Sequence, residues 1–397
     1  MDPKKTFLIL TSDCGFGHRS TANAIDQAMQ ELHPEDSKTV IVNPLTEESS
    51  APFLKQSEQN YDKLVTTNPK FYRFSYELGN SRVGTGLAEG GLTLVLFRDL
   101  QKLIQEINPN AILNTKENLS GPTGTALDLM NERRPLYTVV TDLADVNVMW
   151  FNNYPDRYFV ASDAVRSKAI DYNIDPKKIT ISGIPVNPGF TVNHAAKPEL
   201  RTKLGLDPQL PTLLFIGSSR VKGIFEHLEA LEIVTLPFQV AVIAGGNNEL
   251  YEKVRQRHWN FPIQIQNYVT NMPEWMFSAD ILVTKAGGLV LSEGLAVGLP
   301  ILMIDFLPGQ EEGNVKFIQD NHAGMLVKNP DDFPGMVTEL LRDDQGTLEE
   351  LSSNSRRCGH PDAALVIADA LWQADEVLAP RTAPPPNLWN RVENDAD

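Results

Sequence analysis

The sequence predicts an α/β protein with two domains, each built around a doubly wound parallel sheet. Its apolar runs are short and continuous rather than alternating, which is typical of strands buried on both faces. Most of these runs are followed by a segment with helical spacing of apolar residues, so strands and helices alternate. The alternation stops at a proline-punctuated break over residues 184–189 and resumes at Thr212. A chain of 397 residues is long enough for two such domains.

Each predicted element rests on a local pattern. Predicted strands span residues 7–11, 39–42, 111–114, 137–141, 157–160, 212–216, 239–244, 263–266, 281–284, 301–304 and 324–327. Helical spacing is clearest over residues 22–32, 96–107, 225–233 and 250–257. We therefore predict an N-terminal domain over 1–190 and a C-terminal domain over 191–378. Residues 379–397 are rich in proline and acid, which predicts a disordered tail.

Composition narrows the class of function. The net charge of -16 argues against nonspecific nucleic-acid binding, which needs a basic surface. The two cysteines, Cys14 and Cys358, form no CxxC pair, so they indicate a reducing compartment rather than a disulfide framework or a zinc site. The first apolar run is too short for a signal peptide, and no run reaches the ~18 residues of a spanning helix. We expect a cytoplasmic chain, at most peripheral on the cytoplasmic face of a membrane.

The loop after the first predicted strand is the first candidate for chemistry, because ligands bind beyond the carboxyl ends of parallel strands. Residues 11–19 contain two glycines and open a helix, whose free N–H groups favour an anion. His18 stands at that helix start, where it can act as a general base near neutral pH. The alternative is an ordinary tight turn with an exposed histidine.

A second candidate covers residues 284–296. Here a strand meets Gly287 and Gly288 and then a helix, so backbone N–H groups are offered to a phosphate. Glu293 lies about one turn further in, at the distance where an acidic residue binds a ribose in dinucleotide folds. The alternative is a buried glutamate that is satisfied by structural partners.

Two further post-strand loops carry polar groups. Residues 305–314 are dense in hydrogen-bonding side chains of the kind that distinguish sugar hydroxyls, although a solvated loop before an acidic helix turn would look the same. Residues 141–150 place Asp142 at a strand end, where it is an alternative base. Trp150 follows in the same loop and either faces the site or belongs to the core.

Together these segments resemble the GT-B glycosyltransferases of the group that contains monogalactosyldiacylglycerol synthases and bacterial processive diacylglycerol glucosyltransferases. They resemble more distantly the peptidoglycan UDP-GlcNAc transferase that makes lipid II. The resemblance spans residues 6–345. It is strongest where three segments match in order and spacing: residues 268–272, 284–287 and 308–314. Weaker matches are residues 15–18 to a glycine-rich GGGH turn, 141–150 to a TDL…W segment and 183–186 to a domain-linking stretch.

The resemblance implies a GT-B architecture, with two Rossmann-like domains facing each other across a cleft and a UDP-sugar bound mostly to the C-terminal one. It implies that the backbone near Tyr268 and Val269 meets the uracil, Gly287 and Gly288 hold the diphosphate, and Glu293 holds the ribose. The residues implied to contact the hexose are Gln310, Glu311 and Asn314. The remaining donor-site residues of these motifs are Gly17, Ser218, Ser219, Arg220, Thr270, Met272, Lys285 and Leu289.

The implied reaction is a single inverting displacement in which His18 deprotonates an acceptor hydroxyl. Helix N-termini rather than a divalent metal would stabilise the leaving UDP. No metal and no cofactor is implied beyond the UDP-hexose as co-substrate, and the acceptor is a lipid such as diacylglycerol.

The chain also departs from the family pattern. A glycine-rich loop is replaced by residues 217–223, in which the cations Arg220 and Lys222 stand at glycine positions. The histidine of the TDL…W segment is Asn147 here, and a His-Pro pair is replaced by Lys116 and Glu117. The resemblance therefore predicts the fold more firmly than the catalytic details.

A membrane-facing surface is predicted between residues 55 and 102. This stretch has seven cations against five acids in an otherwise acidic chain, together with aromatic residues and the apolar run 92–97. Cations beside aromatic side chains suit a membrane interface, whereas a core helix with a solvated loop is the alternative. The residues assigned to acceptor and membrane contact are Arg73, Tyr76, Arg82 and Trp150.

Three functions fit these observations. The leading one is a UDP-sugar-dependent hexosyltransferase that acts on diacylglycerol or a related lipid at a membrane surface. The others are a GT-B-fold nucleotide-sugar epimerase, which needs no lipid, and a non-catalytic relative that binds a UDP-sugar or a lipid.

Overall fold

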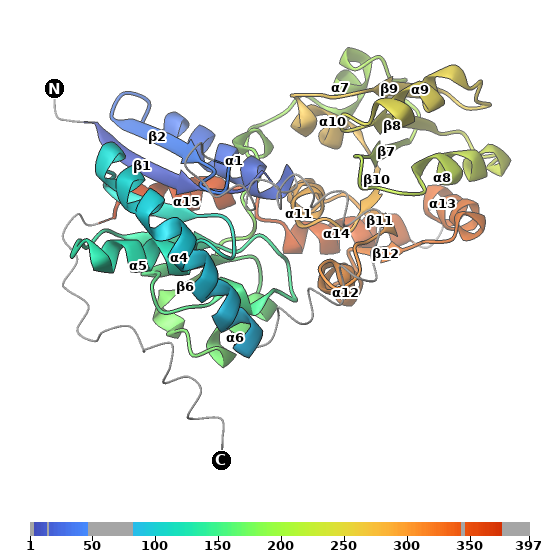
Figure 1. Cartoon of the computed structure of the whole chain (residues 1–397). Coiled ribbons are helices and arrows are strands. Elements are labelled where there is room, and N and C mark those ends of the chain that lie inside the picture. The colour runs from blue at the N-terminus through green and yellow to red at the C-terminus, as the bar shows by residue number, and fades with distance from the viewer. Residues whose placement is uncertain (1–3, 14–15, 47–81, 343–345, 375–397) are drawn as a thin grey trace. The chain divides into compact units, whose positions relative to one another are not determined.

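The computed structural model describes residues 4–13, 16–46, 82–342 and 346–374. The chain divides into two units (Figure 1). The first contains Met1–Pro188, Pro308–Gln310 and Asp362–Asp397, and the second contains Gly189–Leu307 and Glu311–Pro361.

The first unit is built on a six-stranded parallel sheet. Its strands are β1 (Lys5–Leu10), β2 (Ser37–Val42), β3 (Ala111–Asn114), β4 (Leu136–Val139), β5 (Arg157–Val160) and β6 (Ile179–Ile181). Its helices are α1 (Phe16–Leu32), α4 (Arg82–Ile107), α5 (Ser120–Leu129), α6 (Asp163–Asp171) and α15 (Ala363–Trp372). Short 3-10 turns are η1 (Val148–Trp150), η2 (Pro176–Lys178) and, at the unit boundary, η3 (Pro188–Phe190).

Alternate residues of β1 enter two different cores, which explains why this strand is continuously apolar. Phe7 and Ile9 pack with α1 and α15 on one face of the sheet. Leu8 and Leu10 pack with α4 and α5 on the other face. A sheet covered by helices on both faces is the doubly wound arrangement that the sequence predicted.

The second unit has its own six-stranded parallel sheet. Its strands are β7 (Thr212–Ile216), β8 (Gln239–Ile243), β9 (Ile263–Gln266), β10 (Ile281–Lys285), β11 (Ile301–Asp305) and β12 (Gly324–Leu326). Its helices and 3-10 turns are α7 (Lys197–Lys203), α8 (Ile224–Ala230), η4 (Leu231–Ile233), α9 (Asn248–Gln256), α10 (Met272–Ser278), α11 (Gly288–Val297), α12 (Glu312–Asp320), η5 (Pro330–Asp332), α13 (Phe333–Arg342) and α14 (Thr347–Cys358).

Helices cover both faces of this sheet as well. Phe215 and Val242 belong to a core that also contains Leu228 of α8 and Phe333 of α13. On the other face α11 approaches the strands so closely that a Cβ on Gly294 would stand 2.6 Å from Leu282. The sequence therefore predicted the layers of both units correctly.

The order of the strands fixes where ligands can bind. The first sheet runs β2-β1-β3-β4-β5-β6 and the second runs β12-β11-β10-β7-β8-β9. The order reverses between β1 and β3 in the first unit and between β7 and β10 in the second. Loops that leave the carboxyl ends of such a pair diverge to opposite faces and leave a crevice there. The predicted loops with His18 and with Gly287 follow β1 and β10.

The two units of the structure differ from the predicted domains at the C-terminal end. The first boundary, between Pro188 and Gly189, lies within two residues of the predicted one. The predicted C-terminal domain, 191–378, is wrong at its far end because α15 packs against α1 in the first unit (Figure 1). Its apolar residues Ile367 and Leu371 fill the same core as Phe7. The tail predicted over 379–397 lies outside the described residues.

No helix within the described ranges combines the length and hydropathy needed to cross a bilayer. This includes α4, the longest helix of the first unit that the structure describes, at 26 residues.

Candidate functional site

The structure places His18 at the strand-order reversal of the first unit. The residue lies in the first turn of α1, just beyond the carboxyl end of β1. Its ring reaches the loop after β3, where Nδ1 lies 2.7 Å from the carbonyl oxygen of Thr115. The Thr141 hydroxyl, beyond β4, lies 3.2 Å from the same nitrogen. Loops after β1, β3 and β4 thus meet around one imidazole.

These contacts determine which nitrogen of His18 can accept a proton. A backbone carbonyl only accepts hydrogen bonds, so Nδ1 must carry the hydrogen and donate it to Thr115. In the neutral ring the lone pair therefore lies on Nε2. The geometry supports a general base whose reactive atom is Nε2.

The Nε2 atom faces an ion pair that follows β3. The Lys116 Nζ lies 3.3 Å from His18 Nε2 and donates to Glu117 Oε1 at 2.7 Å. The other Glu117 oxygen lies 4.0 Å from His18 Nε2. Burial opposes ionisation of Glu117, but the Lys116 ammonium and the His18 ring outweigh it and keep the pKa of this carboxyl below its usual value. The sequence showed Lys116 and Glu117 only as a departure from the family pattern, not as neighbours of His18.

The loop after β4 differs from its prediction. Trp150 is 1% exposed and belongs to a core cluster with Val140 and Tyr158, so it offers no ring to a membrane. Its ring centroid nevertheless lies 6.3 Å from that of His18. Asn147 accepts a hydrogen bond from the Met149 N–H and caps the 3-10 turn η1. Asp142 is half-buried beside Thr141, and its role as an alternative base stays a prediction.

In the second unit, tight loops follow β7 and β8. A Cβ added to Gly245 would stand 2.1 Å from the Gly217 carbonyl oxygen, so at this point the backbones of the two loops touch. Ser218 accepts a hydrogen bond from the Arg220 N–H, while Ser219 is exposed. The Lys222 N–H donates to Asp305, the last residue of β11. Side-chain oxygens of Ser218 and Asp305 thus bind N–H groups of this loop, in which cations replace glycines.

The loop after β10 leads into α11, which has Gly287 as its N-cap and no capping side chain. Its N–H groups therefore remain available to an anion. Beside this helix start, Lys285 and Glu311 form a buried ion pair, with side chains 15% and 9% exposed. Glu311 also accepts the Leu307 N–H at 2.7 Å. Both residues were predicted as donor contacts, and in the structure they bind each other.

Glu293 lies in α11, in the second turn of the helix. Burial raises the pKa of its carboxyl group to about 8. At neutral pH this group is therefore mostly protonated, which is unusual for a glutamate and typical of groups with a binding or catalytic task. The sequence predicted it as the ribose contact.

The other predicted donor residues differ in how far they are exposed. Asn314 is 1% exposed and donates to the Ala286 carbonyl oxygen at 3.0 Å, so it joins α12 to the loop after β10. Gln310 and Leu289 are half-buried. The segment after β9 is more open: Tyr268 is 69% exposed, Thr270 is exposed, and Val269 and Met272 are half-buried. Gly17 has open space where a Cβ would stand.

The predicted membrane contacts are only partly described. Arg73 and Tyr76 lie outside the described residues, and Arg82 begins α4, where its side chain is not described. In the same helix Leu94 is 75% exposed. Across the described ranges no group of three or more His, Cys, Asp or Glu side chains could hold a metal ion. Metal independence stays a prediction.

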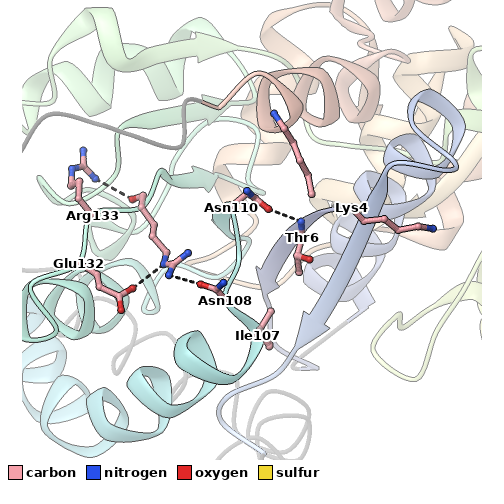
Figure 2. A pocket seen from close by; sticks show the side chains of 9 residues that line it. Lys4, Thr6, Ile107, Asn108, Asn110, Glu132 and Arg133 are labelled. Carbon is pink, nitrogen blue, oxygen red and sulfur yellow. Dashed lines mark hydrogen bonds and ion pairs between the residues drawn. The ribbon is translucent and has the colours of Figure 1, made fainter. Parts of the chain in front are cut away.

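An open pocket of about 620 Å³ lies at the amino ends of β1, β3 and β4 (Figure 2). His18 follows the carboxyl end of β1, so the pocket lies at the opposite edge of the sheet. Its lining includes Lys5, Arg133 and Arg134. Arg133 forms an ion pair with Asp156, and Arg134 bonds to Glu132, to Asn108 and to the Pro109 carbonyl oxygen. Lys5 donates to the Trp372 carbonyl oxygen. These cations hold the fold together.

Two family models match the chain. Residues 18–186 match the model described as monogalactosyldiacylglycerol (MGDG) synthase, and residues 196–358 match glycosyl transferases group 1. The chain is 30% identical over 376 residues to a probable monogalactosyldiacylglycerol synthase, chloroplastic, of Nicotiana tabacum. That alignment covers 92% of this chain and 70% of the tobacco protein.

Solved structures share the fold. MurG of Acinetobacter baumannii matches with a TM-score of 0.61 and 15% identity, over 94% of this chain and 100% of that one. MnaA of S. aureus, in a structure with UDP, matches with a TM-score of 0.59 and 14% identity, over 92% of this chain and 96% of that one. This likeness establishes the two-unit GT-B fold, and the match to the tobacco protein establishes the lineage. The chain belongs to the monogalactosyldiacylglycerol synthase family.

Proposed function

We propose that the chain transfers a hexose, galactose in the first instance, from a UDP-sugar to the free hydroxyl group of diacylglycerol. The observation that carries this proposal is membership of the monogalactosyldiacylglycerol synthase family, with a match over 92% of the chain. The placement of His18 supports it, because the β1/β3 strand-order reversal holds a histidine whose Nε2 can take a proton. Neither an epimerase nor a binding protein is favoured by a specific observation.

The second unit is the proposed donor site. The N–H groups at the start of α11 suit a diphosphate, and Glu293 further along the helix suits the ribose hydroxyls. Lys285 and Glu311 flank Gly287: its Cβ position lies 4.0 Å from the Lys285 Nζ and 3.8 Å from Glu311 Oε1. We assign this ion pair the task of fixing the helix start rather than contacting the hexose directly.

The proposed mechanism is one displacement. The acceptor oxygen attacks the anomeric carbon of the hexose, the bond from that carbon to the diphosphate breaks, and UDP leaves with the bonding electrons. His18 Nε2 takes the proton of the attacking hydroxyl. Because the oxygen attacks in one step on the face opposite the diphosphate, the configuration at the anomeric carbon inverts. Backbone N–H groups at the start of α11 stabilise the charge on the departing diphosphate.

The acceptor is insoluble in water, so we propose that the chain works at a membrane surface that it does not cross. Co-sedimentation with liposomes of diacylglycerol in a neutral lipid tests this part. Lipid-dependent sedimentation would support it. A chain that remains in the supernatant while transferring hexose to detergent-dispersed diacylglycerol would contradict it.

The test of the activity is UDP release from UDP-galactose, UDP-glucose and UDP-N-acetylglucosamine, with and without diacylglycerol liposomes. We expect release that needs both one UDP-hexose and the lipid, with a glycolipid product. Replacing His18 by Gln should reduce turnover at least about 100-fold while UDP affinity stays unchanged, because general-base catalysis contributes roughly 10²–10⁴-fold. Turnover without lipid, or a fully active H18Q variant, would contradict the proposal.

A further inference from the structure

We infer that Lys116 and Glu117 are positioning residues that set the proton affinity of His18 in opposite directions. The inference rests on the proposed role of His18 as the base. It adds two residues that the family resemblance does not supply, because a His-Pro pair occupies their positions in the family pattern.

The geometry puts both charges on the reactive side of the ring. Since Nδ1 donates to Thr115, Nε2 carries the lone pair, and Lys116 Nζ lies 3.3 Å from it. The ammonium is a donor only, so in the neutral state it donates to this lone pair. Glu117 lies 4.0 Å from the same atom and accepts from Lys116 at 2.7 Å. The three groups thus form a cluster around one atom.

The two charges act differently on the two states of the ring. The Lys116 ammonium stabilises the neutral imidazole, through its hydrogen bond, and repels the imidazolium. The Glu117 carboxylate stabilises the imidazolium that forms when Nε2 takes a proton. Charges within 4–6 Å of a titrating group shift its proton affinity by about 1–3 pH units. The two effects oppose each other, so removal of either charge should shift the proton affinity of His18 in one direction.

Burial makes these charges effective. The side chains of His18, Lys116 and Glu117 are 12%, 13% and 24% exposed, so solvent screens them less than a surface pair. The ring also contacts the uncharged Thr115 and Thr141, and the indole of Trp150 lies beside it. On the turn that carries His18, Asp13 and Arg19 pair with each other.

The cluster also implies an exchange during the reaction. An acceptor hydroxyl must occupy the position at Nε2 that the Lys116 ammonium holds. Glu117 already accepts from Lys116 and can retain it when the hydroxyl arrives. The ion pair therefore protects the lone pair in the free protein and releases it to substrate.

The direct test is a titration of the full-length chain with ¹³C-labelled histidine, followed by NMR. The chain has seven histidines, and the H18N variant identifies the resonance of His18. We expect Lys116→Met to raise the midpoint of His18 by about one pH unit or more, and Glu117→Gln to lower it by a similar amount. The double variant should shift it less than either single variant.

Matched controls come from an exposed pair of the same unit. Lys102 and Glu106 form an i,i+4 pair on α4 with side chains 72% and 62% exposed. Lys102→Met and Glu106→Gln remove the same charges at the surface and should leave the His18 midpoint unchanged. Thermal unfolding of each variant shows whether the chain folds. If one single variant does not fold, Lys116→Gln or Glu117→Ala removes the same charge and should shift the His18 midpoint in the same direction.

A second readout uses turnover. The pH midpoint of the acid limb of the kcat/KM profile should rise for K116M and fall for E117Q, by the same amount as the NMR midpoint. A purely structural role would instead lower kcat at all pH values. Unchanged midpoints in both folded variants would overturn the inference. The titration needs no substrate. Shifted midpoints in a chain without transferase activity would contradict the proposed function while sustaining the placement of these charges.

Discussion

Glu293 is a residue whose ionisation couples to donor binding. Burial raises the pKa of its carboxyl group to about 8, so the free protein holds it mostly protonated at pH 7. Two ribose hydroxyls that donate to this group would favour the carboxylate and lower its pKa. We therefore expect UDP binding near neutral pH to release a proton, and UDP affinity to rise from pH 6.5 to 8.5. Titration calorimetry in two buffers of different ionisation heat measures the proton directly.

The variant Glu293→Gln is the control for this linkage. It should weaken UDP binding about tenfold or more, because hydrogen bonds to a charged group contribute about 1.5–3 kcal/mol. It should also remove the proton release, since no carboxyl group remains. An affinity for UDP that is independent of pH in the unaltered chain would show that the ribose does not contact this residue.

The same group affects stability with a defined sign. Its pKa is about 8 in the folded chain, above the ordinary 4.5, so folding favours the protonated form. The free energy of unfolding that it contributes is complete below pH 4.5 and decreases as pH rises toward 8. Melting temperature measured without ligand should therefore fall less between pH 6 and pH 8.5 in Glu293→Gln than in the unaltered chain. Equal falls would contradict the expected burial.

Individual residues also show how far sequence reasoning reaches. The places of His18 and Glu293 in the fold could be predicted because glycines, a strand end and a helix start mark them along the chain. Asn314 and Glu311 were predicted as hexose contacts, but their partners, the Ala286 carbonyl and Lys285, come from other elements. Sequence shows a polar group and not what satisfies it. Lys116 likewise meets His18 only because β3 lies beside β1.

At the scale of elements, the contact between the loops after β7 and β8 makes a sharp prediction. Gly245 has φ +62, and a Cβ there would stand 2.1 Å from the Gly217 carbonyl oxygen. Gly246 has φ +82 but open space around the Cβ position. Gly246→Ala should cost about 1–2 kcal/mol of stability, for left-handed backbone alone. Gly245→Ala should cost clearly more and weaken UDP binding, because the Gly217 loop must move.

Urea denaturation of the two glycine variants, with UDP affinity measured on each, separates these effects. Since both variants carry the same new methyl group, the difference between them isolates the close backbone contact. Equal losses of stability, together with unchanged UDP affinity in Gly245→Ala, would argue against a role for this loop contact in the donor site.

Helices and strands could be predicted where a local run or spacing of apolar residues marks the buried side chains. Strands β3, β5, β7 and β9 begin and end at the residues that the apolar pattern indicated. Strand β6 was missed because its three residues are all half-buried, so no continuous apolar run marks it. The pairing of α15 with α1 was also beyond local pattern, because an apolar helix does not indicate which sheet it will cover.

For the whole molecule, the packing of α15 predicts that the two units can be perturbed separately. The Trp372 ring stacks on His33 with centroids 3.8 Å apart, and Lys5 Nζ lies 4.9 Å from the centroid of the Trp372 ring. Trp372→Ala should destabilise the first unit by about 2–4 kcal/mol, as truncation of a large, mostly packed side chain does. We expect lower transferase activity near the melting temperature but unchanged UDP affinity, because the proposed donor site lies in the second unit.

Val366→Ala is the matched control, because Val366 lies on the same helix and is 39% exposed. Its effect on unfolding should be about 1 kcal/mol or less. The readout is thermal unfolding of the Trp372→Ala variant with and without UDP. UDP should raise the midpoint temperature of the second unit and leave unchanged that of the first unit, which the substitution lowers. Loss of UDP binding in Trp372→Ala would show that the units are not independent.

The return of α15 to the first unit also has a consequence for biosynthesis. A ribosome makes α1 early, yet the apolar side chains of Ile25 and Met29 share a core with Ile367 and Leu371, which follow the second unit in the chain. While the second unit is being synthesised and folds, that face of the first stays uncovered. The nascent chain therefore exposes an apolar surface for most of its synthesis. We expect chaperone binding to this surface, and its release when the last helix emerges from the exit tunnel.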